Sequence, residues 1–176
     1  MAIVPYQQTL THSCLAACFL MLQEKNFTEI DEKELAMNGS SRKYPFYMVG
    51  ISAEFVKKYD GKITIYADNN FFTATLQKGI TGDKKINVIH KKIDMHLISK
   101  LLKKKPIICH IDDHALGDFS HASHFIILEK ESEKFITIID PWNGKKYKIS
   151  KTKLTEAISD LKYHIKMCPL LFSIET

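Results

Sequence analysis

The sequence contains no apolar run that approaches the ~20 residues needed for a membrane-spanning helix. Its opening, MAIVPYQQTLTHS, also lacks the basic stretch followed by an apolar stretch that is typical of secretory signals. Arginine-rich runs and the stacked aromatic motifs of nucleic-acid-binding proteins are missing as well. We therefore expect a cytoplasmic protein whose partners include neither a membrane nor a nucleic acid.

Positive charge is present but not concentrated. Lys and Arg (25) outnumber Asp and Glu (20), which gives a net charge of +5. Only residues 103–105 form a cluster of lysines, at the end of a predicted helix, where solvated cations interact favourably with the helix dipole. The charge pattern therefore indicates no nucleic-acid patch.

The length of 176 residues, with 45% hydrophobic and 26% charged residues, favours one globular domain over residues 1–176. Hydrophobic periodicity predicts helices first and then mostly strands, which is typical of an α+β fold with a mostly antiparallel sheet. The predicted helices are 14–25, 51–59, 95–104 and 151–161, and the predicted strands are 63–66, 86–89, 107–111, 125–128, 135–139, 147–149 and 170–174.

Cys14 has the position of a nucleophile. It lies in the first turn of the first predicted helix, where unpaired N–H groups and the helix dipole favour a thiolate, and Ser13 or Thr11 is placed to cap that helix. Cys18 lies one turn further, on the apolar face, and we expect it to be structural. Without a secretory signal, all four cysteines (Cys14, Cys18, Cys109 and Cys168) are expected to be reduced.

Gln8 precedes Cys14 by six residues, in the loop that enters the helix. Its side-chain amide is a candidate donor to an oxyanion, together with the backbone N–H of Cys14. Two alternatives stay open: Gln7 takes this role, or Gln8 bonds the backbone of its own loop.

His124 and Asp140 are the candidate base and its orienting carboxylate. His124 opens one apolar run, Asp140 closes the next, and residues 129–134 between them predict a hairpin turn. Pairing the two strands about Ser132 places His124 opposite Asp140 on one face of the sheet. A turn with an even number of residues would instead send Asp140 to the opposite face. His121 is the rival base, and capping of the turn is the alternative role for Asp140.

A zinc site is a second interpretation of the histidine-rich segment. The segment contains, in order, His110, Asp112, Asp113, His114, Asp118, His121 and His124. None of the spacings matches a recognised metal-binding scaffold, and no Cys pair accompanies them. We therefore expect no metal and no cofactor. Trp142, just after Asp140, is expected to cover the His124–Asp140 pair and exclude water.

Four motifs together resemble the bacteriocin-processing cysteine peptidases, the papain-like domains that cut double-glycine leaders. Gln8-x5-Cys14 followed by LAAC resembles the Q-x5-C-G-x-A-C opening of that family. The other three are KKPII at 104–108, SHFII at 123–127, and Asp140-Pro141 with Gly144. They occur in the family's order over roughly residues 5 to 150.

The resemblance implies a papain-like fold with the nucleophile helix packed on the sheet. It also implies a stand-alone cysteine peptidase that cleaves a peptide, protein or leader sequence through a Cys-His-Asp triad and an acyl-enzyme intermediate. The chain departs from the family's Asp-Cys-Gly, because Ser13 and Leu15 flank Cys14. Two alternatives stay open: a non-cleaving peptide-binding pseudoenzyme whose cleft Leu15 obstructs, and another acyl-transfer or deamidase activity. Oligomeric state is left open.

Overall fold

The computed structural model describes residues 3–23, 26–80, 84–117 and 120–175. The helices and strands follow in this order: α1 (Cys14–Leu22), α2 (Glu29–Gly39), α3 (Tyr47–Tyr59), β1 (Lys62–Ala67), α4 (Asn70–Gly79), β2 (Ile86–His90), α5 (Met95–Leu102), β3 (Ile107–Asp112), the 3-10 helix η1 (Asp113–Leu116), β4 (Ser123–Glu131), β5 (Phe135–Asp140), β6 (Lys145–Ser150), α6 (Lys151–Tyr163) and β7 (Leu170–Glu175).

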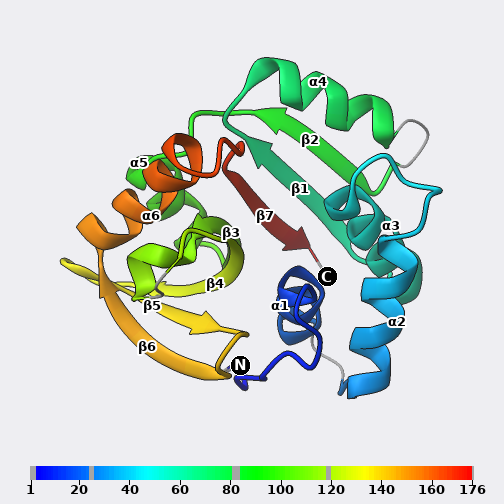
Figure 1. Ribbon diagram of the computed structural model, residues 1–176, viewed down its shortest axis with the longest axis horizontal. Coiled ribbons are helices and arrows are strands. Elements are labelled where there is room, and N and C mark those ends of the chain that lie inside the picture. The colour runs from blue at the N-terminus through cyan, green and yellow to red at the C-terminus, as the bar shows by residue number, and fades with distance from the viewer. Residues whose placement is uncertain (1–2, 24–25, 81–83, 118–119, 176) are drawn as a thin grey trace.

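Over the described residues, seven strands form one twisted sheet in the order β2-β1-β7-β3-β4-β5-β6 (Figure 1). The pair of β1 and β2 is parallel, and every other pair is antiparallel. The predicted α+β class with a mostly antiparallel sheet is confirmed. Within the same residues, no helix combines the length and the hydrophobicity of a membrane span.

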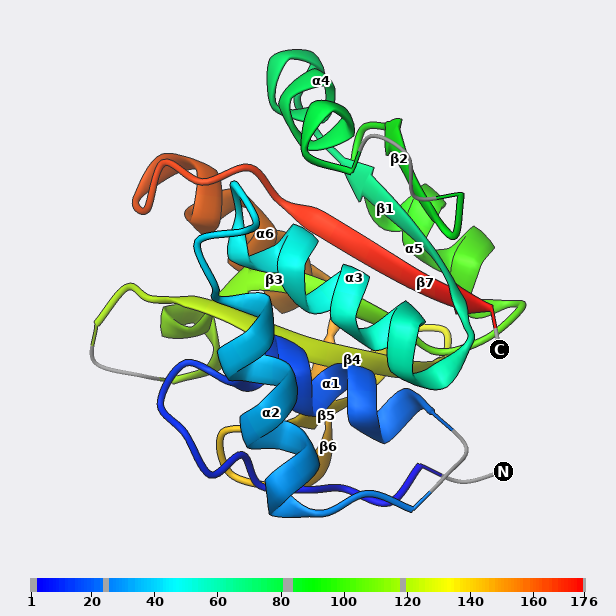
Figure 2. The same ribbon diagram turned by 90° about the vertical axis from the view of Figure 1, so that its right-hand side faces the viewer.

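Helices cover both faces of the sheet (Figure 2). The helices α1, α3 and α4 pack on one face, with α2 packed against α1 and α3, and α5 and α6 pack on the other, so that the central strands β3 and β4 are buried on both sides. Successive residues of these strands point to opposite faces, as Ile126 and Ile127 do, and each enters a different hydrophobic cluster. This burial explains why β3 and β4 contain continuous apolar runs rather than an alternating pattern.

The sequence prediction omitted two helices and shortened a third. α2 is mostly polar and begins with a capping box between Thr28 and Asp31, which hydrophobic periodicity does not detect. α4 begins at Asn70, with the side chain of Asn69 accepting from the Phe72 N–H. The third helix, α3, begins at Tyr47, whereas the prediction began it at residue 51 and assigned residues 44–48 to an aromatic loop.

The predicted register of β4 and β5 is wrong. β4 continues through its charged residues to Glu131, which pairs with Ile136, so an even number of residues, 132–135, separates this pair. Further along the strands, a bulge between Leu128 and Lys130 changes the pairing by one residue, and Leu128 pairs with Ile138. The two shifts cancel in parity, so Asp140 still lies on the face of His124.

Phe19 is expected to be a major contributor to stability. It is fully buried, with its ring 4.9 Å from that of Phe55 and 5.6 Å from that of Phe172. Phe19→Ala should lower the free energy of unfolding by about 3–5 kcal/mol because it leaves a cavity in the core. Urea denaturation measures this, with Phe71→Ala as the control. Phe71 is 82% exposed, and its loss should cost less than about 0.5 kcal/mol. Equal losses in the two variants would contradict this packing.

Candidate active site

Cys14 is the first residue of α1, and it is 7% exposed. Ser13 occupies the N-cap position, but its hydroxyl lies against two acceptors, the Leu10 carbonyl (2.7 Å) and Glu32, and makes no hydrogen bond to the helix, so the predicted side-chain cap is wrong. The first turn of α1 therefore presents its N–H groups without a side-chain cap, which favours a negative charge at the helix start. Leu15 is fully buried in the hydrophobic core, so its side chain does not fill the space in front of Cys14.

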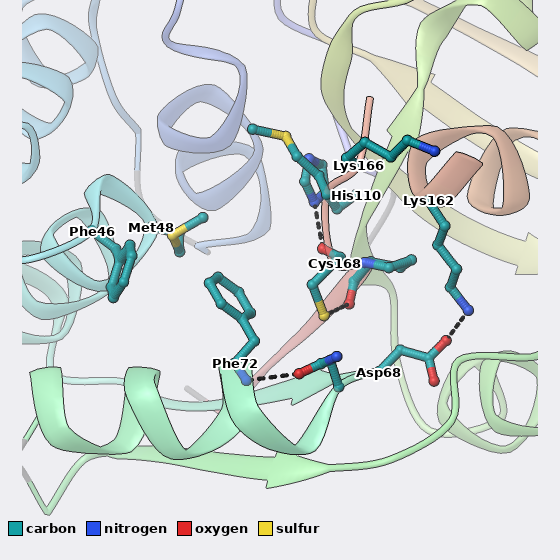
Figure 3. Close-up of a pocket in the computed structure, with 11 residues that line it drawn as sticks. Phe46, Met48, Asp68, Phe72, His110, Lys162, Lys166 and Cys168 are labelled. Atoms are coloured by element: carbon teal, nitrogen blue, oxygen red, sulfur yellow. Dashed lines mark hydrogen bonds and ion pairs between the residues drawn. The ribbon is translucent and has the colours of Figure 1, made fainter. Parts of the chain in front are cut away.

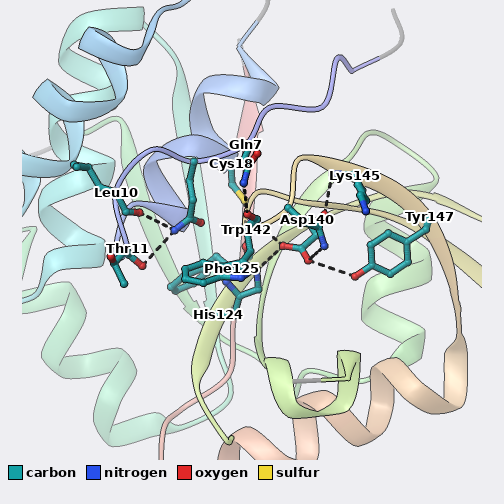
Figure 4. Close-up of polar contacts among 12 residues, drawn as sticks. Gln7, Leu10, Thr11, Cys18, His124, Phe125, Asp140, Trp142, Lys145 and Tyr147 are labelled. Carbon is teal, nitrogen blue, oxygen red and sulfur yellow. Dashed lines mark hydrogen bonds and ion pairs between the residues drawn. The ribbon is translucent and has the colours of Figure 1, made fainter. Parts of the chain in front are cut away.

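His124 and Asp140 form a buried pair at the start of β4 and the end of β5 (Figure 4). His124 Nε2 donates to Asp140 Oδ1 over 2.8 Å. The observed pairing ends with Ile127 opposite Ile139, and one further step in the same register sets Asp140 level with Ile126, so the imidazole reaches the carboxylate diagonally across the two strands. Because Nε2 is used in this way, Nδ1 is the ring nitrogen that remains for Cys14.

The charges at this pair are mutually supported. Burial lowers the pKa of His124, but hydrogen bonds to Asp140 and Cys14 and the charges of both groups outweigh it and raise that pKa to about 10. Burial raises the pKa of Asp140, but the contacts with His124 outweigh it and hold the pKa below its usual value. At neutral pH the pair is therefore an imidazolium and a carboxylate.

The Asp140 carboxylate is held by three further donors. They are the backbone N–H of Trp142 (2.9 Å), the Nδ2 of Asn143 (2.8 Å) and the hydroxyl of Tyr147 (3.4 Å), as Figure 4 shows. Asp140 thus both caps its turn and orients the imidazole, so the two roles that the sequence left as alternatives coexist. The Trp142 side chain is 51% exposed, and its predicted covering of the pair stays a prediction.

Tyr47, at the start of α3, contacts the nucleophile candidate. Burial, the charges of Cys14 and Cys18, and a side-chain hydrogen bond to Cys14 all raise the pKa of Tyr47. Its hydroxyl is therefore protonated and available to donate to the sulfur. The sequence analysis missed this residue because it assigned Tyr47 to a loop. The only feature of the sequence that could have pointed to Tyr47 is its hydroxyl group within the aromatic segment 44–48.

Gln8 takes the backbone-bonding alternative in this structure. Its Nε2 donates to the carbonyls of Leu10 (2.8 Å) and Thr11 (3.2 Å), and its Oε1 is buried without a hydrogen-bond partner among the described residues. Gln7, the competitor, is exposed, and its amide donates to the Trp142 carbonyl (3.3 Å). An oxyanion role for Gln8 therefore requires one amide N–H to leave a loop carbonyl.

Glu32 of α2 organises this entry loop, and the sequence analysis did not identify it. The side chain is 0% exposed and accepts from the Tyr6 hydroxyl (2.6 Å), the Thr9 N–H (3.0 Å), the Thr9 hydroxyl (3.0 Å) and the Ser13 hydroxyl. One carboxylate thus fixes three positions of the segment that ends at Cys14. In the sequence, a role for Glu32 is suggested only by the hydroxyl-rich loop 9–13 and by the presence of an acidic residue in a polar helix.

The entry loop also docks on the turn after Asp140. The Gln8 N–H donates to the Pro141 carbonyl over 2.7 Å. Gly144 has a left-handed conformation (φ 63°), and an added Cβ would lie 2.9 Å from the Cβ of Gln7. The Asp140-Pro141…Gly144 turn therefore both holds the carboxylate and supports the segment that leads to Cys14.

His121 and His110 are engaged elsewhere. His121, the rival base, bonds Asp112 through Nδ1 (2.6 Å), and its ring stacks on that of His164 at 4.2 Å. His110 is buried between Ser123 and the Cys168 carbonyl. Asp118 of the zinc interpretation lies outside the described residues. Among the residues that are described, no group of three or more His, Cys, Asp or Glu side chains is arranged to hold a metal ion.

Two solved structures share this fold over nearly their whole lengths. The peptidase domain of Streptococcus ComA, a bi-functional ABC transporter involved in quorum sensing, matches with a TM-score of 0.62 and 15% identity, covering 99% of this chain and 98% of that one. A C39-like peptidase from Bacillus anthracis matches with a TM-score of 0.54 and 13% identity, covering 97% and 94%. The expected papain-like peptidase fold is confirmed. No protein-family model and no curated protein matches the sequence.

Alkylation should distinguish thiolate character from accessibility. Burial raises the pKa of Cys18 and Cys109, and it raises that of the half-buried Cys168 to about 11. The Cys14 side chain bonds His124, an arrangement that is general among reactive cysteines. Iodoacetamide at pH 6 should therefore modify Cys14 first, as peptide mass mapping would show, and His124→Gln should abolish this preference. First labelling of Cys168, the more exposed thiol, would mean that accessibility alone decides.

The raised pKa of His124 makes stability depend on pH with a defined sign. A pKa that rises from about 6.5 in the unfolded chain to about 10 in the fold stabilises fully below pH ~6.5 and loses this contribution as the pH rises toward 10. The free energy of unfolding should therefore fall from pH 7 to 10 more steeply in the native protein than in Asp140→Asn. Urea titrations at several pH values measure the slopes.

Asp160→Asn is the control for that experiment, because Asp160 lies 3.8 Å from His164, which is exposed. Its slope should match that of the native protein. The same slope in Asp140→Asn would show that the buried pair does not carry the effect.

Proposed function

We propose that the protein is a cysteine peptidase with Cys14 as nucleophile, His124 as general acid and base, and Asp140 as the orienting carboxylate. The observation that carries this proposal is the chain of contacts from the Cys14 side chain to His124 and from His124 to Asp140, at the start of an uncapped helix. The neighbouring folds are peptidase domains, and at 13–15% identity they support the fold of this proposal rather than its chemistry.

The reaction follows from the protonation states. The Cys14 thiolate attacks the carbonyl carbon of a peptide bond, and the oxygen becomes an oxyanion facing the first turn of α1. The His124 imidazolium gives its proton to the departing amine, which leaves a thioester on Cys14. His124 then takes a proton from water, the hydroxide attacks the thioester, and the acid product and the thiolate are released.

Gln8 completes the oxyanion site in this proposal. When substrate binds, one N–H of the Gln8 amide leaves its loop carbonyl and donates to the oxyanion instead. Gln8 is suited to this because it belongs to the loop that enters the helix at Cys14. Glu32 acts as a positioning residue because it ties Thr9 and Ser13, which flank this exchange in sequence. A cleavable peptide is the substrate class, and leader processing is its narrowest form.

Cys14→Ala tests the proposal. Hydrolysis of a double-glycine leader peptide, or of an internally quenched peptide library, should fall by at least ~10³-fold, since removing a nucleophile costs that much or more. Met37→Ala, at a position of α2 that is 71% exposed, is the control and should retain activity. Circular dichroism and thermal unfolding should be unchanged in both variants. Full turnover by Cys14→Ala would end the proposal.

The pseudoenzyme alternative gives a different result. In that case the native protein would bind leader peptide, measured by fluorescence anisotropy, without cleaving it or any library member. The intact contacts among Cys14, His124 and Asp140 favour turnover.

A further inference from the structure

A cavity of about 650 Å³ opens between α3, α4 and the segment that leads into β7. Figure 3 shows Phe46, Met48 and Phe72 on one side of it, facing His110 and Cys168 on the other. This volume is in the range of sites that hold small ligands or side chains, and its walls are mostly apolar. Methionine and aromatic walls adapt to large apolar groups.

The cavity lies directly beside the proposed catalytic centre. On one wall, Met48 follows Tyr47, whose side chain bonds Cys14. On the opposite wall, the His110 ring stacks on Phe125 at 4.3 Å, and Phe125 follows His124. The Phe125 ring also lies 6.3 Å from the ring of Tyr47, and the charge of His124 contributes to the lowered pKa of His110. The cavity is therefore placed to receive a side chain near the scissile bond of a peptide held at Cys14.

His110 provides an uncharged wall. Its Nδ1 lies 3.3 Å from the Cys168 carbonyl, which can only accept, so Nδ1 is protonated and Nε2 accepts from the Ser123 hydroxyl at 2.7 Å. Burial lowers the pKa of His110 to about 4, so the ring is neutral at physiological pH. A neutral ring that is stacked on Phe125 is suited to contact an apolar group.

Charge is confined to the rim of the cavity and is not balanced there. Lys162 forms an ion pair with Asp68. Lys166 is exposed, with a left-handed backbone (φ 60°), and it forms no ion pair with any described residue. The rim thus carries one uncompensated cation beside an apolar interior.

We propose that this cavity binds a large apolar side chain of the substrate peptide, located within two residues of the scissile bond, and that Lys166 pairs with an acidic residue next to it. The position relative to the scissile bond rests on the proposed peptidase function, whereas binding of such a peptide does not. A double-glycine sequence alone would leave the cavity empty. The substrate class is therefore an apolar and acidic peptide segment.

Cleavage preference is the first measurement. In a library of internally quenched octapeptides, each position carries Gly, Leu, Phe, Glu or Lys in turn. At one position within two residues of the cleaved bond, Leu or Phe should raise kcat/KM over Gly by at least ~10-fold. At a neighbouring position, Glu should be preferred over Lys. Equal turnover with Gly and Phe at all of these positions would overturn the proposal.

Adjacent residues of α4 provide matched variants. Phe72→Lys places a charge in the cavity, whereas Phe71→Lys places it on the exposed side of the same helix. Phe72→Lys should abolish the preference for Phe over Gly, and Phe71→Lys should keep it. Lys166→Asn, which suits the left-handed backbone, should remove the preference for Glu and leave that for Phe. If Phe72→Lys fails to fold, Met48→Trp, which fills the cavity, replaces it.

A binding experiment separates failure of this proposal from failure of the peptidase proposal. In NMR titrations of the Cys14→Ala protein, N-acetyl-Phe-Glu-amide should shift the Met48 methyl resonance, and N-acetyl-Gly-Glu-amide should not. If the peptide binds selectively but the native protein cleaves no peptide, the peptidase proposal is wrong and the proposed ligand class of the cavity stands. If the native protein cleaves peptides but neither dipeptide binds selectively, the proposed ligand class of the cavity is wrong and the peptidase proposal stands.

Discussion

The buried hydrogen bond between His124 and Asp140 is the interaction on which the geometry of the site depends. Two charged groups that are 5% exposed each lose most of their hydration, a cost that is offset only when their remaining polar atoms are satisfied. Asp140 meets this condition with three further donors from its turn and from β6. Because Nε2 is committed to the carboxylate, the imidazole has one orientation, and its other nitrogen faces the start of α1.

A second carboxylate, that of Glu32, holds the segment that leads to Cys14, without an ion-pair partner among the described residues. Glu32 is satisfied by four donors, a backbone N–H and three hydroxyls, all from the loop that leads to Cys14. The loop is also bonded to the Pro141 carbonyl next to Asp140. The thiol and the imidazole come from segments more than a hundred residues apart. A buried acid binds the loop before the thiol, another binds the imidazole, and the Gln8–Pro141 hydrogen bond joins the two segments.

The sequence predicted those features that depend on local patterns. Period-two and apolar runs located the strands, and the helix start at Cys14 followed from its apolar spacing. The polar helix α2 was missed because its apolar residues are few, and Glu32 with it, since a buried acid has the same sequence appearance as an exposed one. The His124–Asp140 pairing was predicted on the right face from a wrong register, because a bulge compensated for the even turn. Tyr47 was missed through the late start assigned to α3.

The proposed specificity cavity illustrates why substrate preference is harder to read from a sequence than chemistry. Its walls come from α3, α4, β3 and the segment before β7, and none of these segments carries a motif for it. The triad chemistry requires a few residue types in a fixed geometry, so it leaves a recognisable order along the chain. A side-chain pocket requires only volume and polarity, which many residue combinations provide. A fold shared at 13–15% identity therefore leaves the side chains that line such a pocket free to differ. His110, whose ring stacks on Phe125 next to His124, lies between the candidate triad and the proposed cavity.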